Sequence, residues 1–361
     1  MVRAPPIIDF GAFYTNDPLK KSDLVNQVRQ ACQDHGFFQI VNHGIPVDIL
    51  EAIFQQTCDL FSLPLDVKER YSKVYQSFLS ILRKVPGMTY ADTLTIDIGT
   101  NNRGYEHLRA QNFEKRGPGD LKEGFFIGKD IPPDHPSVLA GKFSQGPNKY
   151  PQEIRDPDLF RSVVDRYHAI MSDLARGILK VLAQTLGLPE TWFDGFCHEP
   201  VATLRLLWYP AQEVTASSHE RGIGAHTNFG AVTILLQDNN GGLQVWDRES
   251  SEWADVVPMP GALVVNLRNM MMRWTNDRYL SNLHRVINRS GRVRYSVPFF
   301  FSGNPDFIVE CIPSCYDEIN KAKYPPITVQ EWMRGRYADT YGRSQEKAME
   351  ELSSEATAAL G

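Results

Sequence analysis

The chain has 361 residues, of which 42% are hydrophobic and 22% charged, and its net charge is −5. That balance excludes the strongly basic surface expected of a nucleic-acid or anionic-membrane partner. No apolar run reaches the ~18 residues of a membrane span, and the N-terminus lacks the apolar stretch of a signal peptide. Five cysteines without a CxxC pair predict reduced thiols. We therefore expect a soluble cytoplasmic protein without a nucleic-acid or membrane partner, and the sequence leaves its oligomeric state open.

Short strands and helices alternate at the start of the chain. "PPIIDF", residues 5–10, predicts a strand, and so does "GFFQIVNHGI", residues 36–45. Between them the apolar spacing of residues 22–34 predicts a helix with Ser22 as its N-cap. Residues 47–61 repeat apolar side chains at helical spacing. The first part of the chain is thus predicted to form a mixed layer of helix and strand.

The middle of the chain has one strong periodic signal. Residues 65–105 show no clean period, and within them the stretch 73–102 is interpreted either as a substrate lid or as an idle loop. Residues 112–153 contain many Gly, Pro and Asp residues and are expected to be irregular. Residues 158–186 carry a long apolar stripe, and Gly187 stands where the terminal glycine of a helix belongs.

After residue 200 the pattern becomes that of β structure. Short runs rich in β-branched and aromatic residues follow one another, separated by Gly, Asn and Asp. The predicted fold is α+β but mainly β, with a double-sheet jelly roll flanked by N- and C-terminal helices, the last at about 328–350. The expected divisions of one compact unit are an N-terminal layer (1–198), a catalytic core (199–312) and a C-terminal segment (313–361).

Two of the nine histidines differ from the rest by their position. His226 and His284 each stand at the end of a β-rich run, and a jelly roll can bring two such ends to one mouth. Two imidazoles and a carboxylate can hold ferrous iron and leave positions open for co-substrate and dioxygen. The other histidines, such as His168 in the long helix, are interpreted as ordinary surface or core residues. His226 and His284 are therefore candidate metal ligands.

A cation and a hydroxyl follow His284 on what should be an inward-facing strand. Arg294 and Ser296 are spaced to lie on the same face of that strand. A buried guanidinium is a natural clamp for a carboxylate, since its fork donates two parallel charge-assisted hydrogen bonds. The alternative for Arg294 alone is a structural salt bridge, but the two histidines favour the clamp.

These motifs resemble the iron(II)/2-oxoglutarate-dependent oxygenases, in the branch related to isopenicillin N synthase. The resemblance covers nearly the whole chain and is carried by "ACQDHGFFQIVNHGIP", "DLKEGFFIGKD", "LRLLWYP", "GAHTNFGAVTILLQDNNGGLQVW" and "RVRYSVPFFF". It implies a double-stranded β-helix core with Fe(II) at His226 and His284, and 2-oxoglutarate held by Arg294 and Ser296 with help from Tyr209. It also implies hydroxylation, desaturation or ring rearrangement of a small specialised metabolite.

The sequence departs from this family at two places. The metal motif is His-x-Asp in the family, whereas this chain has Asn228, whose neutral amide should bind and support Fe(II) less well. After "LVVN" the family usually has Gly-Asp, and this chain has Arg268-Asn269. The arginine at position 268 is either a harmless substitution in a surface turn or a cation that reaches the pocket. Arg205 and Phe300 are further candidate pocket residues.

Three functions remain open from the sequence. The first is a working oxygenase in which Asn228 is a weak third ligand or water takes its place. The second is an enzyme on the same fold that has lost or weakened its dependence on iron and 2-oxoglutarate and catalyses a redox-neutral cyclisation, isomerisation or elimination. The third is a non-catalytic ligand-binding homologue or an inactivated variant. Iron content and succinate release would separate them.

Overall fold

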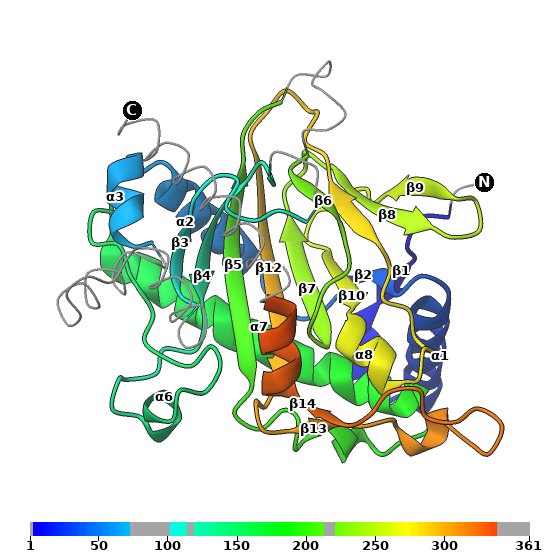
Figure 1. Ribbon diagram of the computed structural model, residues 1–361. Coiled ribbons are helices and arrows are strands. Elements are labelled where there is room, and N and C mark those ends of the chain that lie inside the picture. The colour runs from blue at the N-terminus through cyan, green and yellow to red at the C-terminus, as the bar shows by residue number, and fades with distance from the viewer. Residues whose placement is uncertain (1–2, 73–101, 114–118, 213–220, 338–361) are drawn as a thin grey trace, which may run out of the picture.

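The computed structural model describes residues 3–72, 102–113, 119–212 and 221–337 (Figure 1). The stretch 73–102 lies outside the described residues except for Asn102. Of the predicted terminal helix 328–350, residues 329–337 are helical and the remainder lies outside the described part. No helix among the described residues is both long and apolar enough to cross a membrane.

Two facing β-sheets form the centre of the molecule, as the sequence predicted for a double-stranded β-helix (Figure 1). The larger sheet has the order β1 (Ile7–Asp9), β2 (Phe37–Val41), β10 (Leu263–Leu267), β7 (Val232–Gln237), β12 (Arg294–Gly303), β5 (Val201–Tyr209), β4 (Glu123–Ile127) and β3 (Gly104–Glu106). The smaller sheet has the order β6 (Ile223–His226), β11 (His284–Val286), β8 (Leu243–Asp247) and β9 (Glu252–Asp255). A separate pair joins β13 (Ile308–Val309) to β14 (Ile327–Thr328).

The helices include α1 (Pro18–Asp34), α2 (Val47–Phe61), α3 (Leu65–Arg70), α6 (Pro136–Leu139), α7 (Pro157–Thr185) and α8 (Asn269–Trp274), with short 3-10 turns at Phe10–Tyr14, Glu190–Phe193 and Pro313–Cys315. Three of them, α1, α2 and α7, contact strands of the larger sheet. The long helix α7 contacts β5, β7 and β12 and also packs against α1 and α2 (Figure 1). It ends as expected, because Gly187 adopts φ +73° immediately after the cap residue Leu186.

Two local predictions need correction. The first helix begins at Pro18 rather than near Ser22, because the side chain of Asp17 accepts the backbone N–H of Leu19 at 2.9 Å and proline suits the first helical position. The region 112–153 is not wholly irregular, because it supplies α6 and also β4, which pairs with β5 in the larger sheet.

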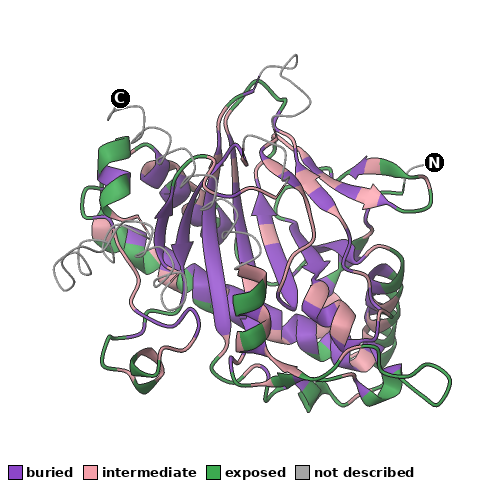
Figure 2. Cartoon of the chain, viewed as in Figure 1, coloured by how far each residue is buried: buried purple, intermediate pink, exposed green. Residues whose placement is uncertain are grey.

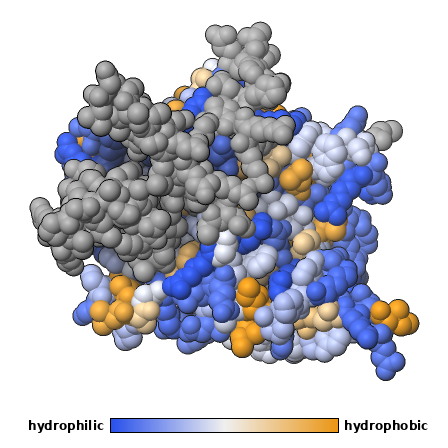
Figure 3. Space-filling model, viewed as in Figure 1, coloured by the Kyte–Doolittle hydropathy of each residue, from blue (hydrophilic) through white to orange (hydrophobic). Residues whose placement is uncertain are grey.

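Apolar side chains are buried on both faces of the larger sheet (Figure 2). Against the helices lies the main core, and between the two sheets lies a smaller cluster built from residues such as Leu207, Leu243 and Val264. On the face shown in Figure 3 the described surface is mostly hydrophilic, and its hydrophobic residues form small separate groups. The space between the sheets is therefore the natural place to look for a ligand.

A tight turn carries the chain from one sheet to the other. Gly241 and Gly242 connect β7 in the larger sheet to β8 in the smaller one with φ values of +71° and +90°. A Cβ at Gly242 would lie 2.3 Å from the carbonyl oxygen of Ile287, so only glycine fits there. This turn fixes how β7 and β8 enclose the inter-sheet space.

Candidate active site

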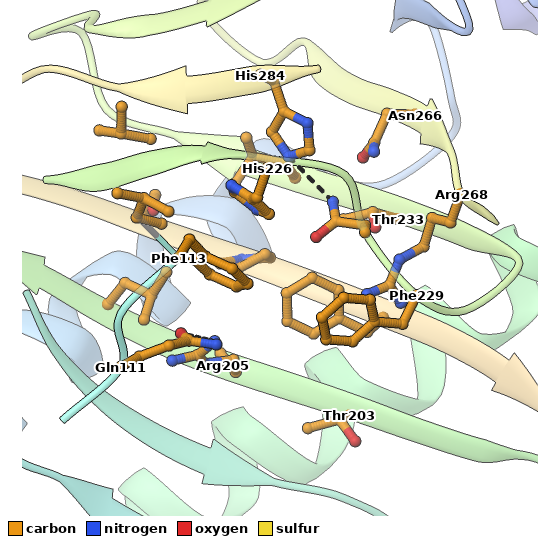
Figure 4. A pocket seen from close by; sticks show the side chains of 18 of the residues that line it. Gln111, Phe113, Thr203, Arg205, His226, Phe229, Thr233, Asn266, Arg268 and His284 are labelled. Atoms are coloured by element: carbon orange, nitrogen blue, oxygen red, sulfur yellow. Dashed lines mark hydrogen bonds between the residues drawn. The ribbon is translucent and has the colours of Figure 1, made fainter. Parts of the chain in front are cut away.

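His226 and His284 lie directly opposite each other on paired strands of the smaller sheet. β6 and β11 are antiparallel, and the two histidines are register partners, so both side chains stand on the same face. Their ring centroids are 4.2 Å apart. Both rings line the cavity between the sheets (Figure 4). Strand pairing thus brings together two imidazoles that are far apart in the sequence.

Backbone carbonyls orient both rings in the same way. The Nδ1 atom of His226 lies 2.8 Å from the Gly224 oxygen, and Nδ1 of His284 lies 3.2 Å from the Asn282 oxygen. A carbonyl can only accept, so each Nδ1 carries the proton and each Nε2 keeps its lone pair. Burial lowers the pKa of His284 to about 4, and burial together with the neighbouring His284 lowers the pKa of His226 well below its usual value. Both rings are neutral at pH 7, the form that binds a metal.

Asn228 completes this group but with an amide. Its Nδ2 atom lies 3.1 Å from Nε2 of His284 and donates to that lone pair. Within the described part of the chain, no group of three or more His, Cys, Asp or Glu side chains could hold a metal ion. The donor set therefore fits iron through two imidazoles, with a neutral amide oxygen as the available third donor. Presenting that oxygen requires the amide to turn and give up its hydrogen bond to His284.

Arg294 lies at one end of the cavity and is 1% exposed. Its Nε donates to the Gly241 carbonyl at 2.7 Å and its Nη2 to Oε1 of Gln237 at 3.3 Å. The guanidinium lies over the Tyr209 ring, 4.8 Å from its centroid, and the Tyr209 hydroxyl is 3.3 Å from Oγ of Ser296. Its Nη1 is buried with no hydrogen-bond partner among the described residues. This end fits the far carboxylate of 2-oxoglutarate, which would supply the missing acceptor.

Arg268 lies at the other end of the cavity and is only 5% exposed, so it is not a surface change. It follows β10 and reaches inward beside Phe229, with its guanidinium 4.6 Å from the centroid of the Phe300 ring (Figure 4). Its Nε and Nη1 have no hydrogen-bond partner among the described residues. Burial lowers the pKa of Arg268 to about 9, so it remains charged at pH 7.

The two departures from the family pattern are neighbours in space. The backbone N–H of Asn269 donates to the Asn228 carbonyl at 3.0 Å, and its side chain donates to Oγ1 of Thr227 at 3.1 Å. The backbone N–H of Arg268 donates to the Ala231 carbonyl at 3.1 Å. These bonds hold the segment after β10 against the segment after β6. The amide at 228 and the cation at 268 therefore belong to one local arrangement.

Arg205 also lines the cavity, but its charge is already compensated. Its guanidinium forms an ion pair with Glu106 and donates to Oε1 of Gln111 at 3.3 Å. Glu106 in turn pairs with the buried Lys122. Arg205 is thus one member of a buried ionic network rather than an unpaired cation.

All the candidate ligand, co-substrate and pocket residues named from the sequence line this one cavity, whereas Asn269 lies outside it, and the structure adds further lining residues. The sequence reading did not identify Gln111, Phe113, Thr233, Asn266 and Tyr337 as lining residues. Phe113 stacks on His226 with ring centroids 4.1 Å apart. Thr233 and Asn266 are polar residues inside otherwise apolar strands, and that was the only sequence signal that could have found them.

Comparisons with known proteins agree with this geometry. Residues 200–303 match the model of the 2OG-Fe(II) oxygenase superfamily, and residues 5–80 match a model described as non-haem dioxygenase in morphine synthesis N-terminal. The chain is 45% identical to the 2-oxoglutarate-Fe(II) type oxidoreductase hxnY of Emericella nidulans, covering 95% of this chain and 92% of that protein. It is 34% identical to the clavatol oxidase claD of Penicillium crustosum, over 93% of this chain and 96% of the relative.

A solved structure shares the architecture over almost the full length. A full-length Neurospora crassa protein, crystallised in complex with alpha-KG and 5-formyluracil, superposes with a TM-score of 0.76 and 27% identity, covering 92% of this chain and 96% of that chain. With 45% identity to one relative over 95% of the chain, and with two neutral imidazoles and a buried guanidinium in one cavity of this fold, the chain belongs to the 2-oxoglutarate-Fe(II) oxygenase superfamily.

Proposed function

We propose that this enzyme holds Fe(II) with His226, His284 and the amide oxygen of Asn228, and that Arg294 anchors 2-oxoglutarate with Ser296 and Tyr209 beside it. Fe(II) and 2-oxoglutarate are the cofactors of the family, and when bound they activate dioxygen to oxidise a C–H bond. One observation supports the assignment above all others. Two neutral imidazoles face the same cavity as a fully buried guanidinium whose Nη1 has no hydrogen-bond partner among the described residues.

The chain's own residues prepare the site for a small specialised metabolite. Carbonyls fix the Nε2 lone pairs of both histidines towards the cavity. Phe113 and Phe229, with ring centroids 6.4 Å apart, cover the space beside His226 and help to exclude water. All five cysteines are unpaired, which supports our proposal of a cytoplasmic enzyme.

Substitution of Asn228 tests the metal assignment directly. We expect Asn228→Asp to bind Fe(II) at least about tenfold more tightly and to increase succinate formation, because a carboxylate adds a negative charge to the ligand set. We expect Asn228→Ala to bind Fe(II) more weakly than the unmodified enzyme. Anaerobic titration with Fe(II) and an assay of succinate measure both effects.

Asn269→Asp is the matched control for this test. It places the same charge on the adjoining segment, at a side chain that donates to Thr227 and is outside the cavity lining. It should change Fe(II) affinity much less than Asn228→Asp. If both variants act equally, or if neither changes Fe(II) affinity, the side chain at 228 is not a metal ligand.

One observation favours a second candidate function. The amide of Asn228 donates to the lone pair of His284 that iron would need, and the same cavity holds Arg268, a cation with no ion-pair partner in the described part of the chain. A redox-neutral isomerisation or cyclisation could use that cation to polarise a carbonyl. Substrate turnover that persists without dioxygen and in the presence of a chelator would support this candidate and exclude the oxygenase.

A further inference from the structure

Unpaired donors gather at the Arg268 end of the cavity. Besides Nε and Nη1 of Arg268, the amide nitrogen of Asn266 and the hydroxyl of Thr233 are buried without a partner among the described residues. All three side chains line the cavity. Asn266 and Thr233 are register partners on β10 and β7, and Arg268 follows Asn266 by two residues, so the strands place them side by side. We call these three residues the Arg268 cluster.

Burying these donors unpaired is costly, and the cost indicates a missing partner. An unsatisfied buried polar group keeps its full desolvation penalty, and the penalty is larger if the group is charged. No carboxylate among the described residues forms an ion pair with Arg268, whereas Arg205 nearby has Glu106. The cluster offers one positive charge and several N–H or O–H donors. The group that satisfies such a set is an acceptor with a negative charge, and a carboxylate fits it.

The co-substrate proposed for Arg294 cannot fill this second site. Arg294 and Phe300 lie on the same face of β12 but six residues apart, so their α-carbons are about 20 Å apart. Arg294 is held at its own end by Gly241, and the Arg268 guanidinium stacks on Phe300 at the other end. A five-carbon diacid has only four C–C bonds of about 1.5 Å each. The two guanidinium groups must therefore serve two different ligands.

Aromatic side chains define the body of the second ligand. The Phe300 ring lies under the Arg268 guanidinium, and Phe229 lies beside it (Figure 4). Phe113 continues this apolar wall to His226. A flat, unsaturated ring would fill the space between the cation and the histidines, with its carboxylate at one end and its C–H bonds towards the imidazoles.

We propose that the Arg268 cluster binds the carboxylate of an aromatic carboxylic acid, which is the class of substrate that this enzyme oxidises. The identification of this acid as the substrate rests on the proposed function, whereas the existence of the carboxylate-binding site does not. Gly230 makes room for the Arg268 guanidinium, because a Cβ at position 230 would lie 2.7 Å from Nη1 of Arg268. The carboxylate is anchored at one end and the reacting part of the ring is presented to His226 and His284.

Calorimetric titration of the full-length protein tests this site with defined probes. The probes are benzoate, cinnamate and 2-naphthoate, each paired with its neutral amide, in anaerobic buffer with and without saturating Fe(II) and 2-oxoglutarate. We expect at least one acid to bind and its amide to bind at least about tenfold more weakly, as for the loss of a charge-assisted hydrogen bond. Arg268→Met should abolish binding of the acid, and Arg268→Lys should weaken it.

Arg294→Met is the matched control at the opposite end, and 2-oxoglutarate is the matched ligand. Arg268→Met should keep 2-oxoglutarate binding, and Arg294→Met should keep binding of the aromatic acid. If 2-oxoglutarate fails to bind the unmodified protein, the proposed function is wrong while the acid titrations still test this site. The inference is overturned if no acid binds, if the amides bind equally well, or if binding survives Arg268→Met.

Discussion

Two arginines of the cavity, Arg294 and Arg268, have no ion-pair partner among the described residues, and they are held in opposite ways at opposite ends of the same sheet. Arg294 is fixed before any ligand arrives, by the Gly241 carbonyl, by Gln237 and by the Tyr209 ring. Arg268 rests on the Phe300 ring, and its Nε and Nη1 have no acceptor within the described ranges. The preorganised Arg294 end suits a co-substrate that is the same in every turnover. The Arg268 end, whose donors are unpaired among the described residues, suits the variable substrate.

The largest effect that follows from this comparison concerns 2-oxoglutarate. We expect Arg294→Met to weaken its binding by about two to three orders of magnitude, because the substitution leaves a buried carboxylate without its cation. Isothermal titration measures the change, and Arg268→Met should alter 2-oxoglutarate affinity by less than about threefold. Comparable losses in both variants would show that the two ends do not have separate ligands.

The pH dependence of stability tests the packing of His168, a buried residue of α7 that contacts the strands next to Phe300. His168 of α7 packs there, with Nε2 3.1 Å from the Ala202 oxygen and its ring against Phe299. Burial lowers the pKa of His168 to about 4, whereas the unfolded chain takes up the proton near 6.5. The stabilisation is therefore complete above pH 6.5, is lost progressively as the pH falls from 6.5 towards the folded pKa, and is gone below about pH 4. For His168 alone we expect a loss of about 2 kcal/mol between pH 7 and pH 5.

Urea denaturation at pH 7 and pH 5 measures that loss. His168→Gln keeps an N–H donor for the Ala202 carbonyl but cannot titrate, so the free energy of unfolding of this variant should fall less on acidification. An equally steep fall in the variant would assign the pH dependence to other groups, such as His226 and His284.

The smallest effect compares the stability of the ligand-free variants. Arg294→Met leaves the Gly241 and Gln237 oxygens without their donor, so we expect it to lower the free energy of unfolding by about 1 kcal/mol. Arg268→Met removes a buried cation that lacks a partner in the described part of the chain, so we expect it to raise stability by about 1 kcal/mol. Opposite shifts of the urea midpoint are expected. A destabilised Arg268→Met protein would indicate that Arg268 has a structural role.

The sequence predicted the strands well because their apolar runs are short and bounded by turn residues, and it predicted α2 at its observed bounds, Val47–Phe61. It missed β4, because Gly and Pro residues around Glu123–Ile127 hide a strand that pairs with β5 on one side and β3 on the other. It gave the first helix the wrong start, since Asp17 is a better cap than Ser22.

The sequence could identify those site residues that belong to a recognisable motif, but not those that reach the site only through strand register. His226 and His284 could be named from the sequence, but their direct pairing across β6 and β11 could not. Asn266 and Thr233 were not predicted as site residues, because they become neighbours only through the register in which β10 pairs with β7. Arg268 follows a strand and resembles a turn residue in the sequence, whereas its backbone bond to Ala231 and its packing on the Phe300 ring place it inside.

The position of the Arg268 guanidinium depends on Gly230, so a mutation at this one residue can change the Arg268 end of the cavity. Its missing side chain leaves the space that the Arg268 guanidinium and the Ser302 hydroxyl share, each only 2.7 Å from where a Cβ would stand. One added methyl group would displace the cation and leave the 2-oxoglutarate anchor untouched at the far end of β12. For the carboxylate that we propose at the Arg268 cluster, a single-codon change at Gly230 would therefore be enough to exchange a charged ligand for an uncharged one while the residues of the Arg294 end stay in place.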